Sequence, residues 1–106
     1  MPSRGYVYIL TNNPNGTLYV GVTSDPVHRI RRHKEGRGSA FAAKYNLTRL
    51  VHIEEHETMQ AALRREKRLK RWRRAWKLSL IRDNNATWDD RYEEVCQILA
   101  NGGRLR

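Results

Sequence analysis

Four side chains suited to phosphate and proton chemistry occur near the start of the chain: Tyr8, Tyr19, Arg29 and His33. A guanidinium can hold two phosphate oxygens at once, and a phenol or an imidazole can move a proton near neutral pH when its pKa is tuned. The four residues therefore predict a site for an anionic substrate, provided that the fold brings them together.

The two tyrosines are expected on one face of a β-hairpin. Each belongs to an apolar run with period-two alternation, YVYIL or LYVGVT, and the intervening NNPNG is rich in turn-forming residues. A turn centred on Asn13-Pro14 sets Tyr8 opposite Tyr19, whereas a two-residue turn at Asn15-Gly16 offsets them along the strands. Both registers keep the two rings on the same face of the hairpin.

The guanidinium and the imidazole are expected on one side of a short helix, because they are four residues apart. Pro26 suits the first helical position, Ser24 or Asp25 can cap the helix, and Gly36 can end it. The helix would then deliver both groups to the tyrosine-bearing hairpin.

The order and spacing of these residues resembles the GIY-YIG nuclease family over roughly residues 5 to 88. The resemblance is carried by Tyr6-Val7-Tyr8, Tyr19-Val20-Gly21, Arg29, His33 and a distal Glu66. Tyr6 stands where the first glycine of the motif usually is, a variation associated with small stand-alone members. Val22 occupies a position where some relatives, such as the excision-repair nuclease subunit, carry a lysine.

The resemblance implies a metal-dependent phosphodiesterase that cuts nucleic acid, most often DNA. It implies that Tyr19 acts as general base, supported by Tyr8, and that Arg29 neutralises charge on the phosphate, with His33 in hydrogen-bonding reach. It also implies one divalent ion, Mg²⁺ or Mn²⁺, on Glu66. An asparagine before a tryptophan makes Asn85 a candidate for orienting the site, and helix termination is an equally good interpretation of that residue.

Glu66 has two interpretations from the residues alone. It falls in the apolar register of a helix that Thr58 can cap, and a carboxylate there is costly unless it is paired or binds a metal. It could therefore pair with Arg64, Lys67 or Lys70, or it could hold the ion that the resemblance implies.

Positive charge is concentrated in residues 64 to 77, which contain nine Lys or Arg and one Glu in a chain of net charge +10. Such a segment predicts contacts with several phosphates. Trp72 and Trp76 lie four residues apart within it, and packing against the core is favoured over base stacking. The residues expected to bind nucleic acid are Lys67, Lys70, Arg71, Arg73 and Arg74.

The remaining sequence predicts an α+β fold with a small antiparallel or mixed three-stranded sheet flanked by helices. SAFAAKY is expected as a short helix, RLVHIEEH as a third strand at an edge, WKLSLIRD as a helix after a bend near residues 72 to 75, and residues 91 to 100 as a last helix. The loop NNATWDD separates the last two helices, Gly102-Gly103 ends the last one, and the tail GGRLR is expected to be disordered.

The totals limit the possible function. A chain of 106 residues allows one domain, and a pI of about 10.5 implies an acidic partner, with nucleic acid ahead of an anionic membrane surface. We expect a cytoplasmic protein, because there is no apolar run long enough for a membrane span and no signal peptide. The single Cys96 excludes an internal disulfide, and His28, His52 and His56 are expected to be exposed, without the spacing of zinc ligands.

No helix-turn-helix, zinc finger or second domain is recognisable, so specificity is expected to come from substrate shape. We therefore expect single-stranded, flapped or branched DNA to be preferred, with little sequence specificity. Two alternatives remain: a non-catalytic nucleic-acid-binding protein, and a structural module that binds a partner through its C-terminal helix. The oligomeric state does not follow from the sequence.

Overall fold

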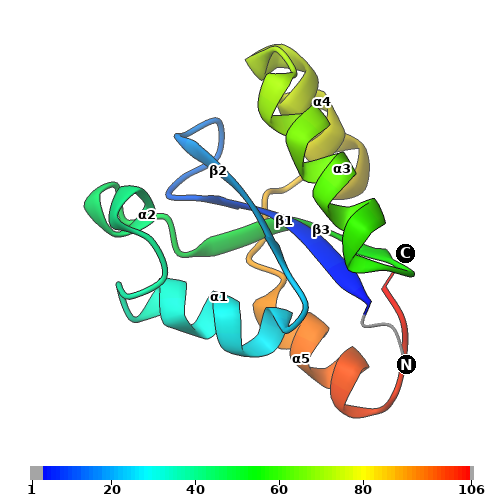
Figure 1. Ribbon diagram of the computed structural model, residues 1–106. Helices are drawn as coiled ribbons and strands as arrows, with labels where there is room; N and C mark the ends of the chain where they lie inside the picture. The colour runs from blue at the N-terminus through cyan, green and yellow to red at the C-terminus, as the bar shows by residue number, and fades with distance from the viewer. Residues whose placement is uncertain (1–3, 106) are drawn as a thin grey trace.

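The first strand is the centre of the sheet. The computed structural model describes residues 4–105, in which β1 (Gly5–Thr11) pairs antiparallel with both β2 (Leu18–Thr23) and β3 (Arg49–His56). The strand order is β2-β1-β3 (Figure 1). The predicted α+β class is confirmed, the sheet is antiparallel rather than mixed, and the third strand lies at an edge as expected.

Five helices in residues 4–105 surround the sheet. They are α1 (Pro26–Lys34), α2 (Ala40–Lys44), α3 (Met59–Arg71), α4 (Arg74–Asn84) and α5 (Tyr92–Ala100). Figure 1 shows α1 and α5 on one side of the sheet and α3 and α4 on the other. None of these helices is long and apolar enough to cross a membrane.

Two apolar clusters fill the spaces between the sheet and the helices, because alternate residues of a strand point to opposite faces. Tyr6, Tyr8 and Leu10 of β1 belong to the cluster that includes Ile30 of α1 and Val95 of α5. Val7 and Ile9 belong to the opposite cluster, with Ala62 and Leu69 of α3 and Ile81 of α4. The tyrosines therefore lie on the face covered by α1 and α5.

The hairpin register differs from both expected registers. Tyr8 lies opposite Gly21, and Tyr19 lies opposite Leu10. The reason is the position of the turn, which is centred on Pro14-Asn15, between the two expected centres, and in which Gly16 N–H donates to Asn13 O at 2.8 Å. The two rings still share one face of the hairpin, as predicted, but Tyr8 and Tyr19 are not directly opposite each other.

The helix boundaries follow the predicted capping signals. Asp25, rather than Ser24, caps α1 by accepting from His28 N–H, and Thr58 caps α3 by accepting from Ala61 N–H. At Trp72 and Arg73 the backbone is extended, with ψ near 147° and 148°, so the chain bends between α3 and α4 where a bend was expected.

The tail beyond α5 does not match the expectation of disorder. Leu105 is only 8% exposed and belongs to the cluster on the α1 and α5 face. Its backbone N–H donates to Glu55 Oε1 at 3.1 Å. Residues 102–105 therefore return to the sheet, a contact that the polar, glycine-rich sequence does not reveal.

Candidate functional site

The four residues singled out by their chemistry meet on the α1 side of the hairpin. The Tyr8 hydroxyl lies 2.9 Å from His33 Nε2, which is hydrogen-bonding distance. The Tyr19 ring centroid lies 6.3 Å from that of Tyr8 and 5.1 Å from that of His33. Arg29, one turn before His33 on α1, is close enough to both phenols to be affected by them electrostatically.

Two glycines make room for this arrangement. A Cβ at Gly21 would lie 2.3 Å from the Tyr8 ring, and a Cβ at Gly38 would lie 2.4 Å from His33 Nδ1. Neither backbone has a positive φ, so the need for glycine is steric rather than conformational. Tyr8 can cross over its partner strand, and His33 can pack against the segment after α1, only because side chains are missing there.

Burial favours the neutral form of both Tyr8 and His33. It raises the pKa of Tyr8 to about 12, although the Arg29 guanidinium acts in the opposite direction. It lowers the pKa of His33 to about 4, and the positive charges of Arg29 and Arg32 act in the same direction. Near neutral pH, Tyr8 is therefore a protonated phenol and His33 a neutral imidazole, and neither changes charge easily.

Arg29 supplies the permanent positive charge of the group. The neighbouring Tyr8 hydroxyl raises the pKa of Arg29, and Tyr19 adds a smaller effect in the same direction. The side chain is half-buried, as is that of Tyr19. Both can therefore meet a substrate, whereas Tyr8 and His33 are closed off behind them.

Glu66 approaches from the other side of the sheet. Its side chain is 14% exposed, and Lys70 Nζ lies 3.2 Å from Glu66 Oε2. The carboxylate also contributes to the raised pKa of Tyr8, after the effects of burial, Arg29 and Tyr19. Pairing with Lys70, one of the two interpretations of Glu66, is therefore observed, and it leaves the carboxylate in electrostatic range of the Tyr8 phenol.

Glu66 offers a single carboxylate, which suits a hard cation that takes its other ligands from water and substrate. In residues 4–105 no three His, Cys, Asp or Glu side chains form a group that could hold a metal ion. Mg²⁺ is commonly bound by one or two carboxylates, with water and phosphate oxygens completing its shell. Because the Lys70 side chain is 54% exposed, it can move aside for such an ion. The donor set therefore fits a divalent ion bound together with a phosphate.

Asn85 is occupied by backbone contacts. Its Nδ2 donates to Val51 O at 3.2 Å and to Asp89 O at 2.9 Å, and its Oδ1 accepts from Asp89 N–H at 3.1 Å. It also follows the last residue of α4 as its C-cap. These contacts favour the helix-termination interpretation, in which Asn85 fixes the loop after α4 against β3.

The expectation that all three remaining histidines are exposed is wrong for His52, which is 4% exposed, and for His56, which is half-buried. Its Nε2 lies 2.8 Å from Glu54 Oε2, His56 Nε2 lies 3.1 Å from Glu54 Oε1, and Arg65 of α3 donates twice to the same carboxylate. Burial opposes ionisation of Glu54, but these partners outweigh it and lower its pKa well below the ordinary value. His28 is exposed, as expected.

The basic segment lies on α3, on the start of α4 and on the bend between them. All five residues expected to bind nucleic acid, Lys67, Lys70, Arg71, Arg73 and Arg74, are exposed. Arg74 also donates to Asn15 O and Gly16 O, which ties α4 to the hairpin turn. The prediction that the tryptophans pack against the core is right for Trp72 but wrong for Trp76, which is 52% exposed.

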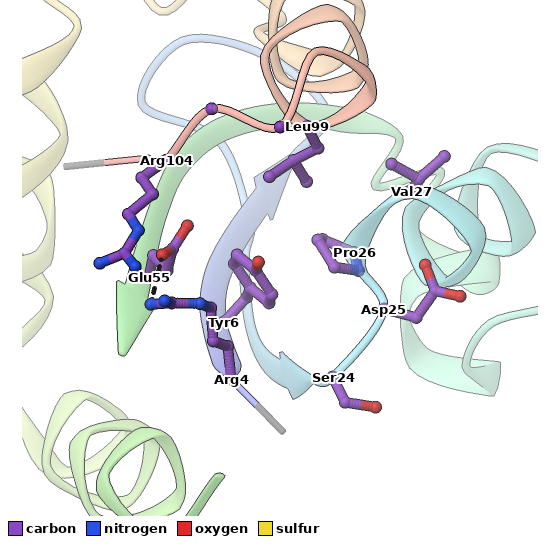
Figure 2. Close-up of a pocket in the computed structure, with 11 residues that line it drawn as sticks. Arg4, Tyr6, Ser24, Asp25, Pro26, Val27, Glu55, Leu99 and Arg104 are labelled. Carbon is purple, nitrogen blue, oxygen red and sulfur yellow. Dashed lines mark hydrogen bonds and ion pairs between the residues drawn. The ribbon is translucent and has the colours of Figure 1, made fainter. Parts of the chain in front are cut away.

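A hollow of about 440 Å³ lies beside this site rather than at it. It is bounded by the start of β1, the start of α1 and the tail, and Figure 2 shows the Tyr6 ring between Glu55 and Pro26. The unusual tyrosine at the first position of the motif thus faces this hollow. Arg4 and Glu55 form an ion pair of 3.0 Å across one side of it.

Comparison with known proteins assigns the chain to a family. Residues 4–79 match the GIY-YIG catalytic domain. The chain belongs to the GIY-YIG family. Membership suggests a nuclease with a nucleic-acid substrate, and GIY-YIG nucleases typically use a divalent metal.

Similar chains are small UPF0213 proteins, which this chain covers over almost their whole length. The UPF0213 protein of Syntrophus aciditrophicus is 38% identical over 86 residues, covering 77% of this chain and 94% of that protein. Those of Streptococcus sanguinis and Staphylococcus aureus are 31% and 35% identical over 83 and 78 residues. Each alignment covers 94% of the relative and 78% or 74% of this chain. No solved structure matches the chain.

The lowered pKa of His33 predicts a loss of stability in mild acid. The unfolded imidazole titrates near 6.5 and the folded one near 4, so between these values the unfolded chain binds more protons and stability falls as pH falls. The slope should reach at most about 1.4 kcal/mol per pH unit. Chemical unfolding from pH 7.5 to 4.5 measures it, and His33→Asn should flatten the slope in this window.

His28→Asn is the matched control, because it removes an exposed histidine from the same helix and should leave the slope in place. NMR titration of the imidazole signals gives an independent measure. A His33 signal that titrates near pH 6.5 in the folded protein would contradict the prediction.

Proposed function

We propose that the protein is a metal-dependent endonuclease that hydrolyses phosphodiester bonds in DNA. The observation that carries the proposal is the convergence of two phenols, a guanidinium and a neutral imidazole, with Tyr8 2.9 Å from His33 over the bare backbone of Gly21. A hydrophobic hairpin does not need a buried phenol–imidazole pair beside a half-buried arginine. An anionic substrate gives each of these groups a role.

In the proposed mechanism Arg29 contacts the non-bridging oxygens of the scissile phosphate and stabilises the negative charge that grows during attack. Tyr19, which is half-buried and lies near the arginine, takes the proton from the attacking water as the bond between phosphorus and the leaving sugar oxygen breaks, and that oxygen takes a proton from solvent. Tyr8 keeps its proton and supports the group through its hydrogen bond with His33. A divalent ion on Glu66 would supply Lewis-acid polarisation of the phosphate.

The assignment of the base to Tyr19 rather than Tyr8 follows from their surroundings. Tyr8 is fully buried and its pKa is raised to about 12, which makes it a poor proton acceptor. Tyr19 is half-buried and lies beside the positive charge of Arg29. A substrate can reach the exposed part of the Tyr19 ring, whereas Tyr8 is closed off from it. Asn85 takes part by holding the loop after α4 in place.

The proposed substrate is DNA with unpaired segments, such as a single strand, a flap or a branch. The exposed cations of α3 and α4 can follow a phosphate backbone, and the family domain occupies most of the chain. Such a substrate would place the protein in the cytoplasm, in contact with the chromosome. A non-catalytic nucleic-acid-binding protein is the alternative, and it explains the charge but not the buried phenol–imidazole pair.

The nuclease proposal predicts that binding and cutting can be separated. Tyr19→Phe removes the proton acceptor and little else, so cleavage should fall by at least about a hundredfold while DNA affinity stays within about twofold. One labelled strand would be presented alone, in a duplex, in a flap and in a four-way junction, with matched salt and Mg²⁺. Efficient cutting by the variant would refute the role of Tyr19, and preferred cutting of plain duplex at one sequence would refute the substrate class.

The metal assignment predicts that Glu66→Gln abolishes the divalent-ion requirement together with cleavage. Titration of Mg²⁺ and Mn²⁺ against the cleavage rate measures this. Glu57→Gln, which removes an exposed carboxylate just before α3, should behave like the parent protein. If the ion dependence of the Glu66 variant equals that of the parent, the ion is held elsewhere.

The basic surface predicts a salt effect. Replacing Lys67, Lys70 and Arg71 by Gln should weaken DNA binding and reduce the salt slope by up to about 0.9 log unit for each duplex phosphate that the variant no longer neutralises. Binding isotherms at several salt concentrations give the slope. Arg82→Gln, an exposed position near the end of α4, serves as the comparison. An unchanged slope in the triple variant would place DNA binding on another surface.

A further inference from the structure

Two aromatic rings are paired and exposed at α2, a helix that the proposed mechanism does not use. Phe41 is 47% exposed and Tyr45 is 41% exposed, and their ring centroids lie 4.9 Å apart with an interplanar angle of 53°. Only Ala42 of this helix is buried in the core. The core therefore gains little from these two rings, whose exposure costs solvation free energy.

The aromatic pair is connected to the candidate site on two sides. Three residues before Phe41, Gly38 packs so closely on His33 that a Cβ there would lie 2.4 Å from the ring. At the other end, Asn12 Nδ2 donates to Tyr45 O at 3.3 Å, which attaches the pair to the end of β1 beside Tyr19. Figure 1 shows α2 next to α1 and near the turn of the β1–β2 hairpin.

The surroundings of the pair attract a polyanion. Residues 26 to 53 contain seven Lys or Arg and a single acidic residue, Glu35. Lys44 Nζ lies 5.4 Å from the Tyr45 ring centroid, so a positive charge lies over one of the two rings. Exposed aromatic rings bordered by cations are the combination with which proteins hold single-stranded nucleic acid, because bases stack on the rings while phosphates meet the charges.

We propose that Phe41 and Tyr45 form a stacking platform for an unpaired DNA base next to the scissile phosphate. The proposal rests on the proposed nuclease function and gives a physical origin for the preference for unpaired DNA. In a duplex, both faces of each base are covered by its neighbours, so the platform adds nothing. In a single strand or a flap, a base can leave its neighbours and lie on the rings.

The exposed Trp76 is another candidate for base stacking, but it lies in different surroundings. Its ring, like that of Tyr45, has a cation over it, with the Arg73 guanidinium 5.5 Å from the centroid, and it lies among the exposed arginines at the start of α4. Trp76 therefore extends the cationic surface of α3 and α4. The pair at α2, by contrast, adjoins the segment that packs on His33.

The test measures base stacking directly. Single-stranded oligonucleotides would carry the fluorescent base 2-aminopurine at successive positions around the cleavage point, in the Tyr19→Phe background so that the strand stays intact. Binding should change the fluorescence sharply at one or two adjacent positions. Phe41→Leu with Tyr45→Leu should remove this change and weaken single-strand binding about tenfold or more, with the salt slope unchanged.

The matched control exchanges the two rings, Phe41→Tyr with Tyr45→Phe, and should behave like the unmodified pair. Thermal melting should show all of these variants folded, since both positions are largely exposed. Unchanged fluorescence and affinity in the double leucine variant, while the parent still cuts DNA, would overturn the platform and leave the nuclease standing. A parent protein that neither binds nor cuts DNA would overturn both.

Discussion

The contact of the Tyr8 ring with the bare backbone of Gly21 is the constraint on which the site depends. Only a missing side chain lets the ring cross β2, because a Cβ there would lie 2.3 Å from it. From that position the hydroxyl reaches His33 on α1, and the same burial keeps the phenol protonated and the imidazole neutral. Packing thus sets both the geometry and the charge of the inner pair, leaving Arg29 and Tyr19 to face outward.

The opposite face of the sheet supports the site through a second polar contact. Glu54 of β3 accepts two hydrogen bonds from Arg65 of α3, each 2.9 Å long, and the two histidines on β3 complete its shell. Arg65 directly precedes Glu66, so the hydrogen bonds between Arg65 and Glu54 fix the position and rotation of α3 at the candidate metal ligand. A partly buried carboxylate held by three cationic or polar partners is stable in one arrangement only, which suits a positioning role.

The parts of this structure that follow from local periodicity were predictable, and those that depend on distant packing were not. Tyr8 and Tyr19 share a face in both expected registers and in the observed one, so the shared face was predictable. The register itself depended on how residues 12 to 17 turn. The caps at Asp25 and Thr58 follow from local chemistry. His52 lies on an edge strand that ends in acidic residues, and its 4% exposure depends on tertiary packing that the alternation of the strand sequence does not predict.

The distribution of charge links the two proposals. Sixteen of the 21 Lys and Arg belong to two stretches, residues 26 to 53 and residues 64 to 77, each with one acidic residue, whereas the remainder of the chain is net acidic. The hairpin turn is tied to both, through Asn12 to α2 and through Arg74 to α4. A strand drawn to these two basic stretches would pass the hairpin that carries Tyr19. Electrostatics alone would hold a duplex equally well, since it reads only phosphates. A preference for unpaired DNA therefore needs a group that recognises the face of a base, a need that the exposed rings of α2 would meet.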